Sequence, residues 1–211
     1  MDAVVFDWDG TLVDTLPAIF RANIDVLGPF GVAFDETRYR EVYVPDWRLM
    51  YRRLGVPEAD LESAGAQWLV RYMASAPPQP LPGVPDALRR LAVAGFAMGL
   101  VTAGHRGLVE SQLDHLGLGS ILPVRVCGDD PVAAKPDPEP LNRALAALRA
   151  GGDPGDATYV GDAPDDMRMA RAAGARAIGI VSILGTAADL MAAGADEVHA
   201  SVAAWVQAFL G

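Results

Sequence analysis

Apolar and amphipathic segments alternate along the second half of the chain. Continuous apolar, β-branched runs of strand length predict strands at residues 96–102, 122–127, 158–161 and 177–181. Apolar residues at helical spacing predict helices at 84–94, 107–116, 138–149 and 164–173. This alternation predicts an α/β fold, in which helices cover both faces of a Rossmann-like parallel sheet.

The first third of the chain follows a different pattern. After an initial apolar strand, residues 16–76 show helical spacing and little strand-like alternation. The proline-rich stretch 77–83 predicts a stiff, extended connector of the kind found at domain boundaries. We therefore predict a core of residues 1–14 and 82–211, with an inserted helical domain at 15–81. The clearest helices predicted in the insertion lie at 16–27 and 61–73.

The first predicted strand ends abruptly in two carboxylates. Asp7 and Asp9 follow the apolar run, and Gly10 then lets the chain turn away. Two carboxylates this close repel each other, so that the site either raises a pKa or binds a cation. Hard oxygen ligands without a neighbouring Cys or His favour Mg²⁺.

Other polar residues follow the predicted strands of the core. Thr102 ends one strand, Lys135 lies in the loop after the next, and Asp162 and Asp166 follow a third. The carboxyl ends of parallel strands meet at one edge of a sheet. Lys135 is the only lysine beside sixteen arginines, and a compact ammonium reaches into a narrow site more readily than a broad guanidinium.

These groups fit the hydrolysis of a phosphate ester. Asp7 would be the nucleophile and form an aspartyl-phosphate. Asp9 would protonate the leaving alcohol and then deprotonate the attacking water. Asp162 and Asp166 would complete a carboxylate set for Mg²⁺, which offsets repulsion between the nucleophile and an anionic substrate.

A second group of residues would hold the substrate. Thr102 and Lys135 would bind the phosphoryl oxygens, where charge gathers in the transition state. His105, just past Thr102, is a further candidate for substrate contact. Arg48, in the inserted domain, is a candidate for binding a second anionic group.

The ordered motifs resemble those of the haloacid dehalogenase superfamily, and within it the phosphoglycolate-phosphatase-like branch with a helical (C1-type) cap. The resemblance rests on Asp7–Asp14, Val101–Thr102, Lys135–Pro136 and Gly161–Asp166. It implies that the backbone carbonyl of Asp9 is a metal ligand and that the cap, residues 15–81, closes over the substrate. Ala103 stands where many relatives have Asn, which leaves only its backbone N–H for the phosphate.

Two other functions share this set of side chains. A β-phosphoglucomutase-like enzyme uses both acids of the first motif but retains its phosphorylated intermediate. A phospho-acceptor signalling module also combines acids, a hydroxyl, a lysine and Mg²⁺ on a parallel sheet, although it is smaller and has no cap. The absence of lysine from residues 15–81 favours hydrolysis over the mutase.

Composition narrows the partners and the compartment. A net charge of −10 argues against a surface for nucleic acid or an anionic membrane. No apolar run approaches the ~20 residues of a membrane span, and the single Cys127 allows no internal disulfide, which suits a reducing cytoplasm. We expect a cytoplasmic enzyme, monomer or dimer, with a small-molecule phosphate ester as substrate.

Overall fold

The computed structural model describes residues 2–148 and 156–211, which form two compact units. One unit runs to Asp14 and continues from Gln79 to the C-terminus; the other is Thr15–Pro78. The sequence places the second boundary after residue 81. Residues 79–81 belong to the first unit because the Asp14 N–H donates to the Gln79 carbonyl and the Leu81 N–H to the Leu12 carbonyl, both at 2.9 Å.

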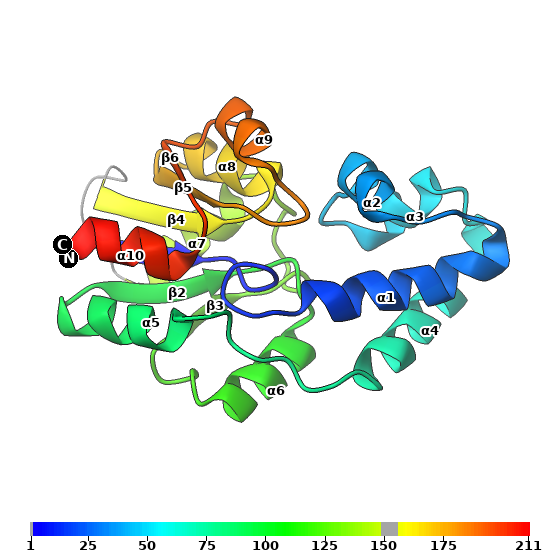
Figure 1. The fold of residues 1–211 in the computed structure, drawn as a ribbon, viewed down its shortest axis with the longest axis horizontal. Helices are drawn as coiled ribbons and strands as arrows, with labels where there is room; N and C mark the ends of the chain where they lie inside the picture. Colours follow the sequence, from blue (N-terminus) through cyan, green and yellow to red (C-terminus); the bar gives the residue numbers. More distant parts are fainter. Residues whose placement is uncertain (1, 149–155) are drawn as a thin grey trace. The chain divides into compact units, whose positions relative to one another are not determined.

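The first unit is built on a parallel sheet (Figure 1). Within the described residues it has six strands in the order β3-β2-β1-β4-β5-β6, and each neighbouring pair is parallel. This confirms the predicted α/β fold. The strands are β1 (Ala3–Phe6), β2 (Ala97–Val101), β3 (Val124–Val126), β4 (Ala157–Gly161), β5 (Arg176–Ile180) and β6 (Glu197–His199).

Helices cover both faces of the sheet, because strands without a polar face must be buried on both sides. One face packs against α5 (Val84–Val93), α6 (Arg106–Leu116) and α10 (Val202–Leu210). The other packs against α7 (Glu139–Ala147), α8 (Pro164–Ala172) and α9 (Ala187–Ala192). In Figure 1, α5 lies below β2, and α8 and α9 lie above β4.

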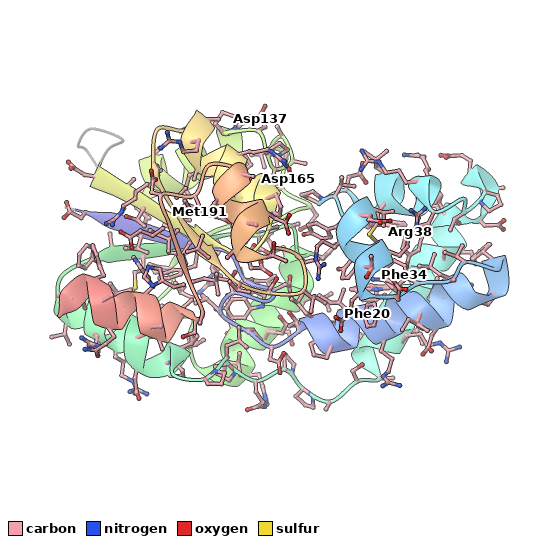
Figure 2. The ribbon with its side chains drawn as sticks, turned by 45° about the horizontal axis from the view of Figure 1, so that its top comes forward. Phe20, Phe34, Arg38, Asp137, Asp165 and Met191 are labelled. Carbon is pink, nitrogen blue, oxygen red and sulfur yellow. The ribbon has the colours of Figure 1, made fainter. Side chains whose placement is uncertain are left out.

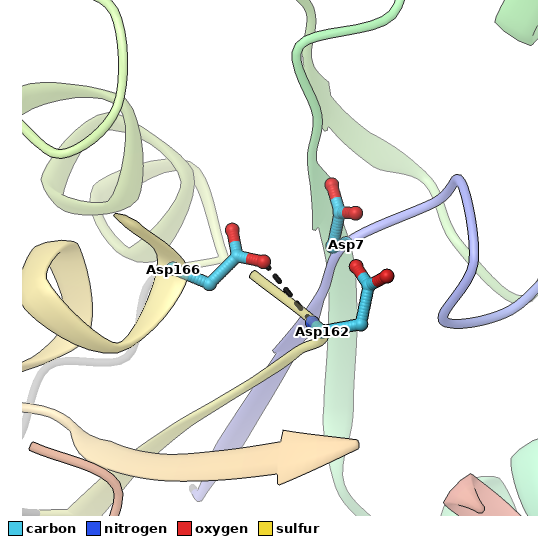
Figure 3. Close-up of side chains that lie close together, drawn as sticks. All are labelled: Asp7, Asp162 and Asp166. Carbon is cyan, nitrogen blue, oxygen red and sulfur yellow. Dashed lines mark hydrogen bonds between the residues drawn. The ribbon is translucent and has the colours of Figure 1, made fainter. Parts of the chain in front are cut away.

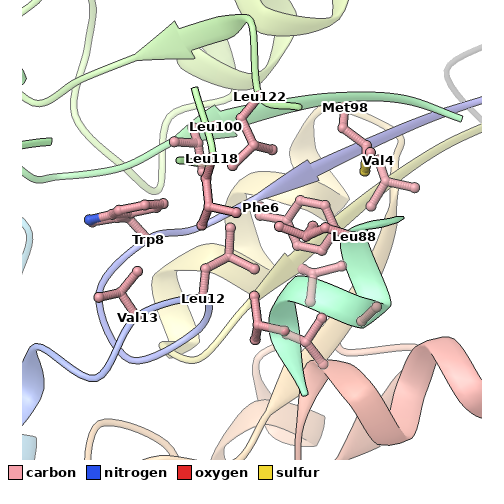
Figure 4. Close-up of a cluster of buried hydrophobic side chains, with 14 of the residues drawn as sticks. Val4, Phe6, Trp8, Leu12, Val13, Leu88, Met98, Leu100, Leu118 and Leu122 are labelled. Carbon is pink, nitrogen blue, oxygen red and sulfur yellow. The ribbon is translucent and has the colours of Figure 1, made fainter. Parts of the chain in front are cut away.

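β1, in the interior of the sheet, contributes side chains to the hydrophobic core on both faces. All four residues of β1 are buried, and their side chains divide between the two faces. Figure 4 shows Val4 and Phe6 of β1 among Leu88 of α5 and Met98 and Leu100 of β2. The strand is therefore fixed from both sides up to the point where its polar residues begin.

The second unit is helical and has an aromatic cluster. Ring centroids of Phe20 and Phe34 are 5.6 Å apart, and Tyr39 lies 5.3 Å from Phe34; Figure 2 labels both phenylalanines. The buried Tyr51 hydroxyl donates to Asn23 Oδ1 at 2.8 Å. Its α-helices are α1 (Leu16–Leu27), α2 (Glu36–Val42), α3 (Trp47–Arg53) and α4 (Leu61–Met73), with short 3₁₀ turns at Gly28–Phe30 and Glu58–Asp60.

Most predicted elements lie where the sequence placed them. The helices at 16–27 and 61–73 are confirmed with the same bounds. The strand predicted at 122–127 is shorter, because Pro123 has no N–H to give the sheet and Leu122 belongs to the preceding turn. The helix predicted at 138–149 begins at Glu139, and its predicted last residue lies outside the described residues. No helix in the described ranges combines the length and hydrophobicity needed to cross a membrane.

The packing of α5 gives a test of where stability resides. Leu88 is fully buried and Val93, on the same helix, is 90% exposed. We expect Leu88→Ala to lower the free energy of unfolding by about 2–5 kcal/mol, because it removes buried methyl groups and leaves a cavity. Val93→Ala should change it by less than about 0.5 kcal/mol. Urea denaturation checks both, and equal effects of the two variants would contradict this description of the core.

Candidate functional site

Three carboxylates meet at the carboxyl edge of the sheet. Asp7 directly follows β1, and its N–H extends the pairing with β4 by donating to the Val160 carbonyl at 2.8 Å. Asp162 directly follows β4, and Asp166 lies in the first turn of α8. All three are buried, and each offers an oxygen within 4.8 Å of the others (Figure 3). The structure thus brings together three of the predicted metal ligands.

Asp166 is held by hydrogen bonds on both oxygens. Its Oδ2 accepts from the backbone N–H groups of Asp162 at 3.1 Å and Ala163 at 3.0 Å, the first of which is drawn in Figure 3. Its Oδ1 accepts from Lys135 at 2.7 Å. A Cβ on Gly161 would lie 2.5 Å from Asp166 Oδ2, so that only glycine allows this approach. Asp166 therefore fixes the turn that carries Asp162.

Lys135 lies at the centre of the cluster. Its Nζ is 2.7 Å from Asp7 Oδ1, from Asp166 Oδ1 and from the Tyr159 hydroxyl. Its side chain is only 6% exposed. The single lysine thus lies at the same edge of the sheet as the carboxylates and gives them a buried positive charge, while its predicted contact with phosphoryl oxygens stays a prediction.

One ammonium does not balance three carboxylates. Burial raises the pKa of Asp7 to about 7, with Lys135 opposing the rise and Asp166 and Asp9 adding to it. Burial, and then the charges of Asp7 and Asp166, raise the pKa of Asp162 well above its usual value. Burial lowers the pKa of Lys135, but Asp166 and Asp7 outweigh it, and the net pKa is raised. The cluster therefore needs a proton or a second cation.

Asp162 has an oxygen suited to a cation. Its Oδ1 accepts from the Thr11 hydroxyl at 3.3 Å. Its Oδ2 is buried and accepts no hydrogen bond from the described residues. Leaving a buried carboxylate oxygen unpaired is costly, and a hard divalent cation such as Mg²⁺ prefers oxygen ligands of this kind. The residues present thus fit a metal ion.

Thr102 and Asp9 lie close to Gly104, in the loop after β2. The Thr102 hydroxyl accepts from the Gly104 N–H at 3.0 Å, which leaves its proton to donate. A Cβ on Gly104 would lie 3.2 Å from Thr102 Oγ1 and 3.3 Å from Asp9 Oδ2. Asp9 and the neighbouring Ala103 are half-buried. The Asp9 carboxylate and the Thr102 hydroxyl therefore both lie next to Gly104.

Two predicted substrate contacts have partners of their own. His105 caps the N-terminus of α6, where its Nδ1 accepts from the Gly107 N–H at 3.3 Å and its Nε2 lies 3.3 Å from Asp129 Oδ2. Arg48 is paired within the helical unit: its Nη2 and Nε donate to Glu62 at 2.8 and 3.0 Å. Substrate binding by these side chains stays a prediction, which these pairings do not favour.

Sequence reasoning missed Tyr159. The residue lies within an apolar strand, where a tyrosine is indistinguishable from the core residues around it. Its hydroxyl contacts Lys135 only because the fold brings β4 close to the loop that carries Lys135. No spacing along the chain indicates this contact.

Comparisons with known proteins agree with these motifs. Residues 4–180 match the family described as haloacid dehalogenase-like hydrolase. The N-acetylmuramic acid 6-phosphate phosphatase of Pseudomonas aeruginosa is 32% identical over 182 residues, which cover 83% of this chain and 80% of that protein. The phosphoglycolate phosphatase of Rhodospirillum rubrum is 34% identical over 185 residues, which cover 82% of this chain and 76% of that protein.

A solved structure shares the fold over nearly the whole chain. CbbY from Rhodobacter sphaeroides, in complex with phosphate, matches with a TM-score of 0.77 and 26% identity, covering 96% of this chain and 95% of that one. The family match and the two relatives confirm the resemblance drawn from the four motifs. The chain therefore belongs to the haloacid dehalogenase-like hydrolases.

Proposed function

We propose that this hydrolase is a Mg²⁺-dependent phosphatase, which cleaves a small-molecule phosphate monoester through an aspartyl-phosphate on Asp7. The observation that carries the proposal is the buried cluster of Asp7, Asp162 and Asp166 around the only lysine. The printed names of two relatives, phosphatases of phosphoglycolate and of N-acetylmuramic acid 6-phosphate, support this substrate class. So does the phosphate complex of CbbY.

The proposed chemistry has two displacements. A carboxylate oxygen of Asp7 attacks phosphorus, the bond to the ester oxygen breaks, and Asp9 gives that oxygen a proton. Asp9 then takes a proton from water, whose oxygen attacks the same phosphorus and releases phosphate and free Asp7. Lys135 offsets charge at Asp7 throughout, and the Thr102 hydroxyl and the Ala103 N–H would hold phosphoryl oxygens.

The metal would be held mainly by Asp7 and Asp162. Their burial and the unpaired Oδ2 of Asp162 support this assignment, and the family resemblance adds the backbone carbonyl of Asp9. When bound, Mg²⁺ supplies the positive charge that offsets repulsion between the nucleophile and the phosphate dianion. Asp166, whose oxygens both accept hydrogen bonds from the chain, would act by orienting Asp162 and Lys135.

The helical unit Thr15–Pro78 has the place in the sequence of a family cap, between the first two motifs. We propose that it selects the alcohol part of the substrate, because the core groups address only the phosphate. A cytoplasmic location and a monomeric or dimeric state stay predictions from the sequence.

The nucleophile can be tested by substitution. We expect the native protein to release phosphate from at least one ester in a panel of phosphoglycolate, sugar phosphates and N-acetylmuramic acid 6-phosphate. Release should need Mg²⁺ and stop with EDTA, and Asp7→Asn should lower it by at least about a thousandfold, because an amide cannot form the acyl phosphate.

Asp86→Asn is the matched control, since Asp86 lies on α5 with a side chain 77% exposed. It should keep the native rate. Phosphate release by Asp7→Asn near the native rate would exclude Asp7 as nucleophile. A native protein that interconverts sugar phosphates without releasing phosphate would favour the mutase.

The burial of Asp7 predicts a pH dependence of stability. The pKa of Asp7 rises from 3.8 to about 7 on folding, so the folded state binds this proton more tightly than the unfolded chain. The resulting stabilisation is complete below pH ~4 and is lost as the pH rises through about 7. We expect the Tm of the metal-free protein to fall between about pH 4 and pH 7 and then to level off, and Mg²⁺ to raise it most at the upper end.

Asp7→Asn isolates this contribution, because its amide does not titrate. The variant should show a shallower fall in Tm than the native protein over the same pH range, measured by differential scanning calorimetry. Parallel curves for the two proteins would show that Asp7 ionises in the folded protein as it does in the unfolded chain.

A further inference from the structure

The buried Tyr159 has no place in the proposed reaction. Its side chain is fully buried among the residues that pack on α7 and α8. Its hydroxyl lies 2.7 Å from Lys135 Nζ, 2.8 Å from the Val101 carbonyl oxygen and 3.2 Å from Asp166 Oδ1. A tyrosine that only filled the core would need one partner for its hydroxyl, whereas this one contacts the charged centre of the site.

The contact with Tyr159 gives the Lys135 ammonium its third hydrogen-bond acceptor. A lysine ammonium has three protons, and Lys135 has three acceptors at equal distances of 2.7 Å, in Asp7, Asp166 and Tyr159. Two acceptors are carboxylates, and the third is the phenol. Nζ lies 5.4 Å from the centroid of the Tyr159 ring, so the hydroxyl and not the ring face is the close contact.

The phenol is oriented to accept. Burial raises the pKa of Tyr159 well above its usual value, so the hydroxyl keeps its proton. That proton has a near acceptor in the Val101 carbonyl, at 2.8 Å. With the proton directed there, a lone pair of the oxygen is left for Lys135.

The same contact joins separate strands. Tyr159 belongs to β4 and Val101 ends β2, and β1 lies between these two strands in the sheet. Val101 lies one residue beyond the last paired residues of β1 and β2, Phe6 and Leu100. The phenol therefore links Lys135 to the strand end that leads into Thr102.

We propose that Tyr159 is a positioning residue for Lys135, which holds the ammonium beside Asp7 through a neutral oxygen anchored on β2. The role rests on the proposed function. When Asp7 carries the phosphoryl group, its carboxyl group loses its charge, and the phosphoryl oxygens and Asp166 then attract the ammonium from different directions. Tyr159 keeps its contact in both states, so that Lys135 stays near the phosphoryl oxygens during the second displacement.

The chain offers a direct probe, because Lys135 is its only lysine. Protein grown with ¹⁵Nζ-lysine gives one side-chain ammonium signal, whose proton exchange with water is measured by NMR, in Mg²⁺ and again after chelation. We expect slow exchange in the native protein. Tyr159→Phe keeps the ring and removes the hydroxyl, and should speed exchange by about tenfold, because one proton loses its acceptor.

Tyr51→Phe is the matched control. It removes another buried hydroxyl, which donates to Asn23 Oδ1 at 2.8 Å in the helical unit. It should leave the Lys135 signal as in the native protein. Unchanged exchange in Tyr159→Phe would overturn the proposal, because the phenol would then serve only the Val101 carbonyl. Fast exchange in the native protein would overturn it without any variant.

Kinetics add a second readout. Tyr159→Phe should lower kcat by about tenfold and leave KM within about twofold, because the contact supports the reaction more than substrate binding. An unchanged kcat would overturn the proposal. The ammonium signal does not depend on turnover, so a native protein without phosphatase activity would refute the proposed function and leave the positioning contact to be judged by NMR alone.

Discussion

The burial of three carboxylates around one ammonium is the constraint on which the site depends. Lys135 is the cation that the described residues place against Asp7 and Asp166, and it does not prevent burial and the neighbouring carboxylates from raising the pKa of Asp7 and of Asp162. Burial is the main cause of the raised pKa of Asp7, the charges of Asp166 and Asp9 add to it, and Lys135 opposes it only in part. A proton or a metal ion therefore stabilises a protein with this cluster. In the proposed phosphatase, the metal ion would also offset the repulsion between Asp7 and the phosphate dianion.

The strands and the helix that follows β4 hold these acids in fixed positions. β1 is apolar and buried along its length, and it delivers Asp7 at the point where its pairing with β4 ends. β4 delivers Asp162 beside it, and the first turn of α8 returns Asp166 onto the same backbone. The acids are thus held by strands packed on both faces, and their separation does not depend on long flexible side chains. Tyr159 extends this rigidity to the ammonium by tying it to the end of β2.

Local pattern was sufficient for most of the fold. The strand runs, the helical insertion and the polar positions that follow the strands all follow from spacing and side-chain type, and the structure brings Asp7, Lys135, Asp162 and Asp166 close together. No individual helix or strand was predicted after residue 181. Of the elements found there, β6 is a three-residue edge strand with half-buried side chains and carries little pattern, but α10 buries Val202, Trp205 and Val206 at helical spacing and was missed. The sequence also did not indicate side-chain partners that only the fold brings together, such as Glu62 for Arg48, Asp129 for His105 and the Tyr159 phenol for Lys135.

Direct measurement of metal binding tests the central claim, that the carboxylate cluster is completed by a cation. Isothermal titration calorimetry at about pH 7.5, where Asp7 is mostly ionised, should give one Mg²⁺ bound per chain for the native protein. Asp162→Asn should bind far more weakly, because it removes the charge on the carboxylate whose Oδ2 lacks a partner among the described residues. Equal binding by both proteins, or no Mg²⁺ bound by the native protein at millimolar concentration, would contradict the account.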